Sequence, residues 1–148
     1  MFETPRPLPP EIFRHTFTLV PRVAVCLQVR GAKGEVLLAR RSLEMETMPG
    51  AWHYPGACLW RGETIAACAD RIARKELGVG IVGEPRPFGF FEDLDGDPRG
   101  HVIDLVLEVD LEGEPAITAE TGELAYCAQI PPDVAFYHDR ILRAAGLS

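Results

Sequence analysis

At 148 residues the chain has the length of one domain, enough to bury a single continuous core. Its hydrophobic content of 47% and charged content of 25% are those of a folded soluble protein, and no apolar run approaches the roughly 18 residues of a membrane helix. The formal net charge of −7 excludes attraction of nucleic acid by the overall field, so we expect a small phosphorylated substrate as the partner.

The amino terminus lacks a basic segment followed by an apolar stretch, so we expect no secretory signal, no membrane partner and a cytoplasmic location. The four cysteines form no C-x-x-C pair and have no histidine at zinc-ligand spacing, and we interpret them as reduced thiols in or near the core. These residues are Cys26, Cys58, Cys68 and Cys127.

Four prolines within the first ten residues predict that residues 1–12 form an extended, proline-rich arm instead of a helix. Such an arm is compatible with a homodimer in which it lies across the partner. Apolar–polar alternation predicts a strand over Arg22–Arg30, and Glu35–Arg40 is the expected returning strand of a hairpin that turns at Gly31–Gly34. Ser42–Gly50 is expected to be a loop.

The strongest helix candidate is Thr64–Leu77, whose apolar residues recur at helical spacing. Asp70 and Arg74 form an i,i+4 pair in the favourable order within it, and Gly78 supplies the stop.

The rest of the chain contains two predicted strands, Pro87–Leu94 and His101–Asp110, joined by a turn-rich segment, and a further strand over Glu123–Ile130. Pro131-Pro132 then opens a terminal helix over about Asp133–Ala145. The order of strands, helix, strands and helix predicts an α/β fold with a mixed β-sheet sandwiched between helices.

The most informative segment runs from Gly50 to Val79, GAWHYPGACLWRGETIAACADRIARKELGV. Seven residues separate Glu63 from Arg71, and Glu76 follows five residues after Arg71, just before Gly78-Val79. This pattern resembles the Nudix box, G-x5-E-x7-R-E-U-x-E-E-x-G-U, where U is aliphatic. The alignment puts Ala57 at the opening glycine of the box.

The resemblance implies a single Nudix-like α/β/α domain over residues 1–148 and a magnesium-dependent hydrolase, with Mn²⁺ as the alternative ion. The substrate would be a nucleoside diphosphate linked to another moiety, such as a nucleotide sugar. By the same analogy Glu76 and the carbonyl of Ala57 are metal ligands, whereas Arg71 pairs with Glu63 in a structural task.

The sequence departs from the box at two positions. Ile72 and Lys75 stand where the family pattern has acids, so the helix cannot supply three clustered carboxylates. One magnesium ion held by Glu76 and a carboxylate from elsewhere is the expected arrangement, because Mg²⁺ keeps several waters and needs few protein ligands. The alternative is a catalytically inactive ligand-binding or regulatory module that keeps the fold.

Glu120 and Glu123 are the candidates for the second carboxylate. They lie just before the last predicted strand, where Nudix proteins often place an acid in a loop that faces the box. Glu120 is a candidate metal ligand, and either glutamate is a candidate general base. The alternative interpretation is a pair of solvated loop acids.

Three arginines are candidate substrate contacts, because a guanidinium binds phosphate in bidentate fashion. Arg40 and Arg41 end a strand beside the predicted site, and Arg99 follows the acidic turn. That turn holds Glu92, Asp93, Asp95 and Asp97, which we interpret as a solvated hairpin tip. We interpret the histidines as structural or solvent-facing, with His53 nearest the box; they are His15, His53, His101 and His138.

Two subgroups of the family share further features. GDP-mannose mannosyl hydrolases have a similarly thinned box, and Arg41 matches a phosphate-binding arginine of that subgroup. Isopentenyl-diphosphate isomerase resembles the segment RRSLEMETMPGAW, Arg40–Trp52, and the KELGV helix end. An isomerase-like enzyme with Cys58 as its cysteine is therefore a further alternative.

Overall fold

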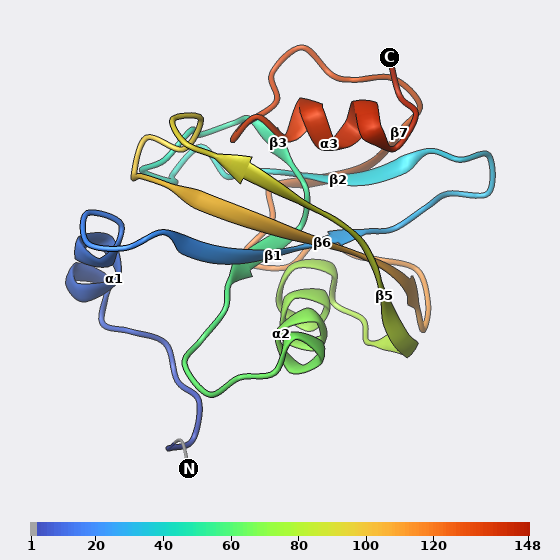
Figure 1. Cartoon of the computed structure of the whole chain (residues 1–148). Coiled ribbons are helices and arrows are strands. Elements are labelled where there is room, and N and C mark those ends of the chain that lie inside the picture. Colours follow the sequence, from blue (N-terminus) through green and yellow to red (C-terminus); the bar gives the residue numbers. More distant parts are fainter. Residues whose placement is uncertain (1–2) are drawn as a thin grey trace.

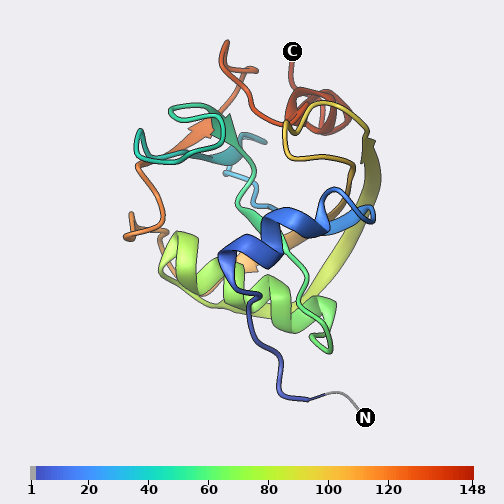
Figure 2. The ribbon, with the colours of Figure 1, turned by 90° about the vertical axis from the view of Figure 1, so that its left-hand side faces the viewer.

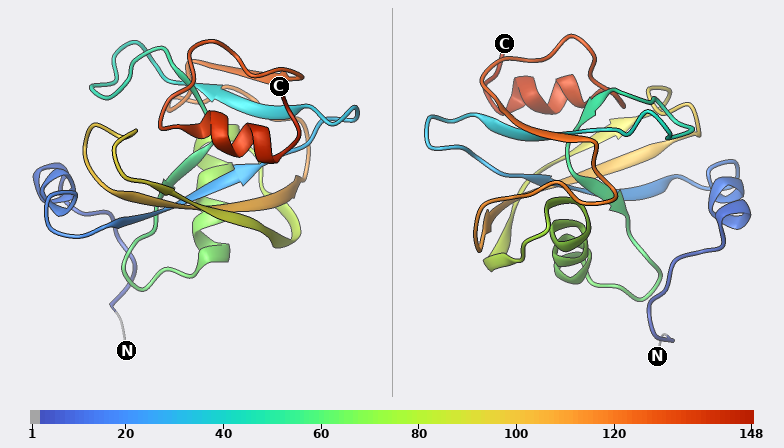
Figure 3. Two further views of the ribbon diagram at one scale, coloured as in Figure 1. Left: turned by 45° about the horizontal axis from the view of Figure 1, so that its top comes forward. Right: turned by 180° about the vertical axis from the view of Figure 1, so that it is seen from behind.

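Two β-sheets form the centre of the protein, with helix α2 on one side of them and helix α3 on the other (Figures 1 and 3). This computed structural model describes residues 3–148. The arrangement confirms the predicted α/β class with a mixed sheet. In the described part of the chain, no helix is long and apolar enough to cross a membrane.

The larger sheet has four strands in the order β4-β1-β6-β5. Strand β1 pairs in parallel with β6 and antiparallel with β4, so the sheet is mixed. The bounds of the strands are Arg22–Gln28 for β1, Gly56–Cys58 for β4, Ile81–Asp93 for β5 and Val102–Leu111 for β6.

The smaller sheet is antiparallel and has the order β3-β2-β7. Its strands are β2 (Val36–Arg40), β3 (Trp52–His53) and β7 (Glu123–Cys127). The sequence did not predict β3 and β4, because strands of two and three residues are too short to show a period.

Two apolar clusters hold the helices against the sheets. The cluster under α2 joins Ile72 and Cys68 to Val25, Leu27 and Leu107. The cluster under α3 joins residues of β2, β6 and α3, with Leu38, Val106 and Leu142 among its members. Strands β1 and β2 each contribute residues to both clusters, but they belong to different sheets.

The predicted hairpin is therefore only partly correct. The two expected strands meet at an isolated bridge between Arg30 and Val36, and β1 and β2 pair with other strands beyond it. Strand β5 begins at Ile81, before the expected Pro87, and it contains Pro85. Proline is tolerated there because β5 is an edge strand with register shifts.

The central helix begins and ends as predicted but is not regular. The hydroxyl of Thr64 accepts a hydrogen bond from the N–H of Ala67 at 3.1 Å, which caps α2 (Ile65–Ile72). The chain continues as one π-helical turn, Ala73–Leu77, and ends at Gly78, whose φ of 70° is left-handed. The π-turn lies at Glu76, and such turns are frequent at functional sites.

The two ends of the chain depart from the prediction. Helix α1 (Pro10–Thr16) begins within the expected extended arm, because a proline is tolerated at the first turn of a helix; residues 1 and 2 of that arm lie outside the described residues. Helix α3 spans His138–Ala144 and starts later than expected. Phe136 and Tyr137 have positive φ angles of 59° and 54°, which a right-handed helix cannot contain.

Candidate functional site

The loop before α2 is fastened to the helix by a buried ion pair. The guanidinium of Arg71 donates to the two carboxylate oxygens of Glu63 at 2.8 and 2.9 Å, and to the carbonyl of Cys58 at 3.0 Å. Burial opposes ionisation of Glu63, but the bonds from Arg71 and the N–H of Trp60 outweigh it and keep its pKa below the ordinary value. The pair therefore holds the loop in place.

Glu76 has the opposite environment. Burial, with a smaller contribution from the nearby Glu120, raises its pKa to about 8, although the N–H of Gly56 at 2.8 Å and the charges of Arg41 and Arg71 favour the ionised form. A carboxylate that is this poorly compensated attracts a cation. Raised pKa values of this kind are common at functional sites.

The loop that carries Glu120 is anchored to the end of the helix that carries Glu76. The hydroxyl of Thr121 donates to the carbonyl of Glu76 at 2.6 Å, and the hydroxyl of Thr118 donates to the carbonyl of Lys75. These carbonyls have no partner inside the helix, because they belong to its last turn. Glu120 itself is exposed, and its position next to Glu76 follows from these anchors.

The two residues that replace acids of the box have different environments. Ile72 is buried at 1% exposure in the apolar cluster under α2. Lys75 is exposed, and its ammonium lies 5.7 Å from the centroid of the Trp60 ring. Neither residue is a ligand for a divalent cation.

A cavity of about 1300 Å³ connects these groups. Of the residues expected to act in the site or to hold the box together, seven line it: Arg41, Ala57, Glu63, Arg71, Glu76, Arg99 and Glu120. Arg40 and Glu123 are not among the lining residues. They pair with each other at 3.2 Å, and Arg40 also donates to the carbonyl of Gly50.

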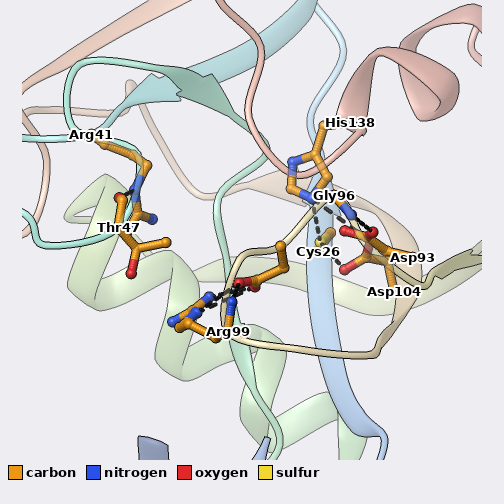
Figure 4. A network of polar contacts seen from close by, with 9 residues as sticks. Cys26, Arg41, Thr47, Asp93, Gly96, Arg99, Asp104 and His138 are labelled. Carbon is orange, nitrogen blue, oxygen red and sulfur yellow. Dashed lines mark hydrogen bonds and ion pairs between the residues drawn. The ribbon is translucent and has the colours of Figure 1, made fainter.

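Arg41 and Arg99, the two expected phosphate contacts that line the cavity, are held by their own neighbours. Arg41 donates to the carbonyl of Thr47 at 2.7 Å, and Arg99 forms an ion pair with Asp97 at 2.7 Å. Burial lowers the pKa of Arg41, and the charge of Arg99 adds to that effect. Figure 4 shows the side chains of Arg41 and Arg99. Both are placed to contact an anionic group in the cavity.

Helix α1 lies at one end of the sheets, to the left in Figure 1, and Figure 2 views the molecule from that end. Phe13 and Phe17 of this segment line the cavity, and the guanidinium of Arg99 lies 4.8 Å from the centroid of the Phe17 ring. The amino-terminal segment therefore forms an apolar and aromatic wall of the cavity, which Pro7, Leu8 and Pro10 of the expected arm also line.

The acidic turn is not the solvated hairpin tip that we expected. Asp93 and Asp97 are exposed by only 1% and 4% and line the cavity, whereas Glu92 and Asp95 are exposed. The turn packs against the start of α3, where the Tyr137 ring lies against Gly96, and Asp93 accepts a hydrogen bond from the N–H of Gly96.

Three further cavity residues were missed by the sequence analysis: Cys26, Asp104 and His138. Each of them is buried. Asp104 stands in the apolar run of β6 on the same face as Val102 and Val106, so its period-two position was a usable signal. Nothing in the sequence marked His138, which burial keeps neutral with a pKa of about 3.

The residues present fit one divalent cation. The carboxylates of Glu76 and Glu120 belong to segments tied together at the helix end, and Ala57 lies in β4 beside Gly56, which binds Glu76. Oxygen ligands of this kind suit Mg²⁺, which needs one or two carboxylates. The observation that favours a cation here is that few positive or donor groups surround the buried carboxylate of Glu76.

A buried glutamate–arginine pair thus fastens a loop to a helix, beside a second glutamate that lines the cavity. The NUDIX domain model matches residues 20–145, so the chain belongs to the Nudix family. The family generally uses divalent metals, typically Mg²⁺.

Two relatives are similar in sequence. The low-salt glycan biosynthesis protein Agl8 of Haloferax volcanii is 36% identical over 101 residues, 64% of this chain. The aligned part spans 62% of the length of that relative. An ADP-ribose pyrophosphatase of Methanocaldococcus jannaschii is 26% identical over 135 residues, which cover 90% of this chain and 78% of the relative.

Solved structures agree in fold. A MutT NUDIX hydrolase of Burkholderia pseudomallei has a TM-score of 0.73 at 21% identity, and the match covers 84% of this chain and 98% of that one. The NUDIX domain of Shewanella oneidensis NrtR, solved with ADP ribose, has a TM-score of 0.69 at 18% identity, with 93% and 91% covered. These likenesses show the fold.

Proposed function

We propose that the protein is a magnesium-dependent hydrolase of a nucleoside diphosphate linked to another moiety, such as a sugar. The observation that carries the proposal is the environment of Glu76. Its carboxylate is poorly compensated, it is bound by the N–H of Gly56, and it lies near both Glu120 and Arg41 in one cavity. A cation and a diphosphate together would satisfy all of these groups.

In this proposal Glu76, Glu120 and the carbonyl of Ala57 hold the ion. When bound, the ion neutralises phosphate oxygens and lowers the pKa of a coordinated water. Arg41 and Arg99 contact the phosphates through their guanidinium groups, and their partners Thr47 and Asp97 hold the two side chains in position. Glu63 and Arg71 keep the loop on the helix.

Glu120 is the proposed general base. It is exposed at the cavity and free to accept a proton from the attacking water, a task that contributes about 10²–10⁴-fold in rate. Glu123 is less suited, because it pairs with Arg40 outside the lining of the cavity. The same exclusion applies to Arg40 as a phosphate contact.

The relatives support a nucleotide-derived substrate. The aligned pyrophosphatase is named for ADP-ribose, and the aligned NrtR domain was solved with ADP ribose. For this chain we propose a small nucleotide substrate of that chemical class. A cytoplasmic location and a homodimer remain predictions from the sequence.

The second candidate is a module that binds such a ligand without turnover. The burial of Ile72 and the exposed ammonium of Lys75 favour it, because both positions hold acids in the family pattern. The isomerase alternative rests on Cys58, whose thiol lines the cavity but whose pKa is raised by burial.

The test is turnover of ADP-ribose and GDP-mannose with Mg²⁺, with products identified after reaction in ¹⁸O-labelled water. A hydrolase gives labelled products; label in a phosphate indicates attack at phosphorus, and label in the sugar indicates attack at carbon. Glu76→Gln should lower kcat by about 10²–10³-fold, the range for removal of one preorganised electrostatic contact. Exposed Glu84→Gln is the matched control and should retain the rate.

Intact nucleotide after long incubation, together with measurable binding by calorimetry, would support the binding module. An unchanged rate in Glu76→Gln would contradict the assignment of the metal site.

A further inference from the structure

Four buried polar side chains from four different segments meet beside the cavity. We call them the polar floor: Cys26 on β1, Asp93 at the end of β5, Asp104 on β6 and His138 at the start of α3. All four line the cavity, and Figure 4 shows them grouped together. The proposed hydrolysis uses none of them.

The polar floor has unused hydrogen-bonding capacity. Oδ2 of Asp93 has no hydrogen-bond partner among the described residues, although it is buried. Nε2 of His138 lies 3.8 Å from Oδ2 of Asp104, which is too long for a hydrogen bond. The thiol of Cys26 contacts Oδ1 of Asp104 at 3.7 Å. Sγ of Cys26 also lies 4.0 Å from Nε2 of His138, so among these four described residues only Asp93 has a buried atom without any partner. Buried polar groups are normally satisfied, so Oδ2 of Asp93 indicates an absent partner, and the long contacts of the other three side chains leave room for it.

The tautomer of His138 decides what kind of partner fits. The N–H of Tyr54 donates to Nδ1 of His138 at 3.1 Å, so Nδ1 carries a lone pair. In the neutral ring the proton is then on Nε2, the nitrogen that faces Asp104 and Cys26. His138 therefore presents a hydrogen-bond donor to the polar floor, while Asp93 and Asp104 present acceptors.

A metal ion does not fit this pattern. One ligand atom from each of Cys26, Asp104 and His138 lies within 4.8 Å of the others, which is a spacing that an ion could span. However, a metal ion needs the lone pair on Nε2, and moving the proton to Nδ1 would oppose it to the N–H of Tyr54. A phosphate would accept from His138 but would be repelled by two acids.

A hydroxyl group fits all the requirements, because it accepts one hydrogen bond and donates another. The location also agrees with the proposed reaction. Gly56 donates to the carboxylate of Glu76 and pairs in register with Cys26, so the polar floor adjoins the end of the cavity that holds the proposed diphosphate site.

We propose that the polar floor binds hydroxyl groups of the sugar attached to the substrate's diphosphate, with His138 as donor and with Asp93 and Asp104 as acceptors. This inference rests on the proposed function. It specifies that the group attached to the nucleoside diphosphate carries several hydroxyls. The same chemistry is present in the ribose of the nucleoside, so the experiment separates the two sources.

The experiment compares two substrates of the same base: whichever of ADP-ribose and GDP-mannose the wild type hydrolyses faster, and the methyl ester of that nucleoside diphosphate. Asp104→Asn should lower kcat/KM for the sugar substrate by about 10–100-fold, the equivalent of one lost hydrogen bond to a charged group. The methyl ester lacks the sugar hydroxyls, and its kcat/KM should change less than about twofold, a shift smaller than one weak hydrogen bond.

Asp110→Asn is the matched control, because it makes the same substitution on the same strand at an exposed residue that pairs with Arg86. Asp93→Asn is a second test variant and should show the same selectivity for the sugar substrate. Circular dichroism and melting curves establish that each variant is folded.

Equal losses for both substrates, or no loss for either, would overturn the inference while leaving the hydrolase intact. A loss that disappears with the 2′-deoxynucleoside form of the sugar substrate would assign the polar floor to the nucleoside ribose and overturn the assignment to the attached sugar. Stoichiometric zinc, retained by the wild type after dialysis against ZnCl₂ and lost in Cys26→Ser, would overturn the hydroxyl assignment.

If the wild type hydrolyses none of these compounds, the proposed function fails, and calorimetry with the same compounds still tests the polar floor. The wild type should then bind the sugar nucleotide at least about tenfold more tightly than the methyl ester, the equivalent of one such hydrogen bond. Equal affinities would overturn the inference.

Discussion

Two glutamates of the same motif have opposite electrostatic environments. Glu63 is paired with Arg71 through two hydrogen bonds, and its pKa is lowered. Glu76 lies in the π-helical turn at the end of the helix. It accepts one hydrogen bond, from the N–H of Gly56, and has a pKa of about 8. The first carboxylate is satisfied by the chain itself, whereas the second is the group for which we propose a bound cation.

The difference separates a structural role from a functional one without reference to any relative. A charge whose partner is built into the fold contributes to stability, and its removal leaves the partner buried and unpaired. A charge without such a partner costs stability and is retained for binding or catalysis. The following predictions test each side of the contrast.

Breaking the ion pair of Glu63 and Arg71 should have the largest effect on stability. Arg71→Ala leaves Glu63 buried without its cation, and we expect a loss of about 3–5 kcal/mol in the free energy of unfolding, measured by urea titration. The side chains of Arg71 and Glu63 are exposed by 15% and 5%, so solvent compensates little.

The control lies on the same helix. Arg74 and Asp70 also form an ion pair at 2.9 Å, but both side chains are largely solvent-exposed. Asp70→Ala should change the free energy of unfolding by less than about 1 kcal/mol. Similar losses in Arg71→Ala and Asp70→Ala would contradict the distinction between the buried pair and the exposed pair.

The raised pKa of Glu76 predicts that, without metal, stability depends on pH. The pKa of Glu76 is raised from 4.5 to about 8 in the folded state, so between these values the folded protein holds a proton that the unfolded chain releases. Stability must therefore fall as the pH rises through this window. Between pH 6.5 and 8 we expect the titration of Glu76 to lower the free energy of unfolding by about 2 kcal/mol, since one pKa unit corresponds to about 1.4 kcal/mol.

Glu76→Gln isolates this effect when unfolding is measured in EDTA at both pH values. Burial lowers the pKa values of His53 and His138 to about 4 and about 3, so these residues add stability only as the pH rises toward 6.5. Asp104, with a pKa raised to about 7 by burial, contributes to both proteins and cancels in the difference. Parallel pH curves for wild type and Glu76→Gln would contradict the prediction.

Local signals in the sequence were enough to predict the central helix and its motif. Thr64 and Gly78 mark the ends of that helix, and the spacing of Glu63, Arg71 and Glu76 identifies the family. The pairing of strands was predicted less well. Alternation in Arg22–Arg30 shows that a strand forms but not which sheet it enters, because its pairing partners β4 and β6 come from distant parts of the chain.

The site was predictable where it depends on the motif and not where it depends on tertiary contacts. Glu120 was named because Nudix proteins often place an acid in the loop before the last strand, and Glu120 lines the cavity. Asp93 was misassigned to solvent, because the packing of its turn against the start of α3 has no local signature. His138 enters the cavity through two residues with positive φ, Phe136 and Tyr137, which no preference of those residue types predicts.

The smallest expected effect concerns the link between the loop of Glu120 and the helix of Glu76. Thr121 is buried, and its hydroxyl donates to the carbonyl of Glu76 at 2.6 Å. Thr121→Val keeps the shape of the side chain and removes the donor, so we expect a loss of about 1 kcal/mol in unfolding free energy. Because the same bond positions Glu120 opposite Glu76, kcat should fall about fivefold, the rate equivalent of that free energy.

Thr121→Ser restores a hydroxyl at this position and should recover both quantities. If Thr121→Val lowers the unfolding free energy but leaves kcat unchanged, the bond from Thr118 to the carbonyl of Lys75 is sufficient to position Glu120. If Thr121→Val keeps the wild-type unfolding free energy and kcat, this bond does not hold Glu120 near Glu76. The raised pKa of Glu76 would then be explained by burial alone.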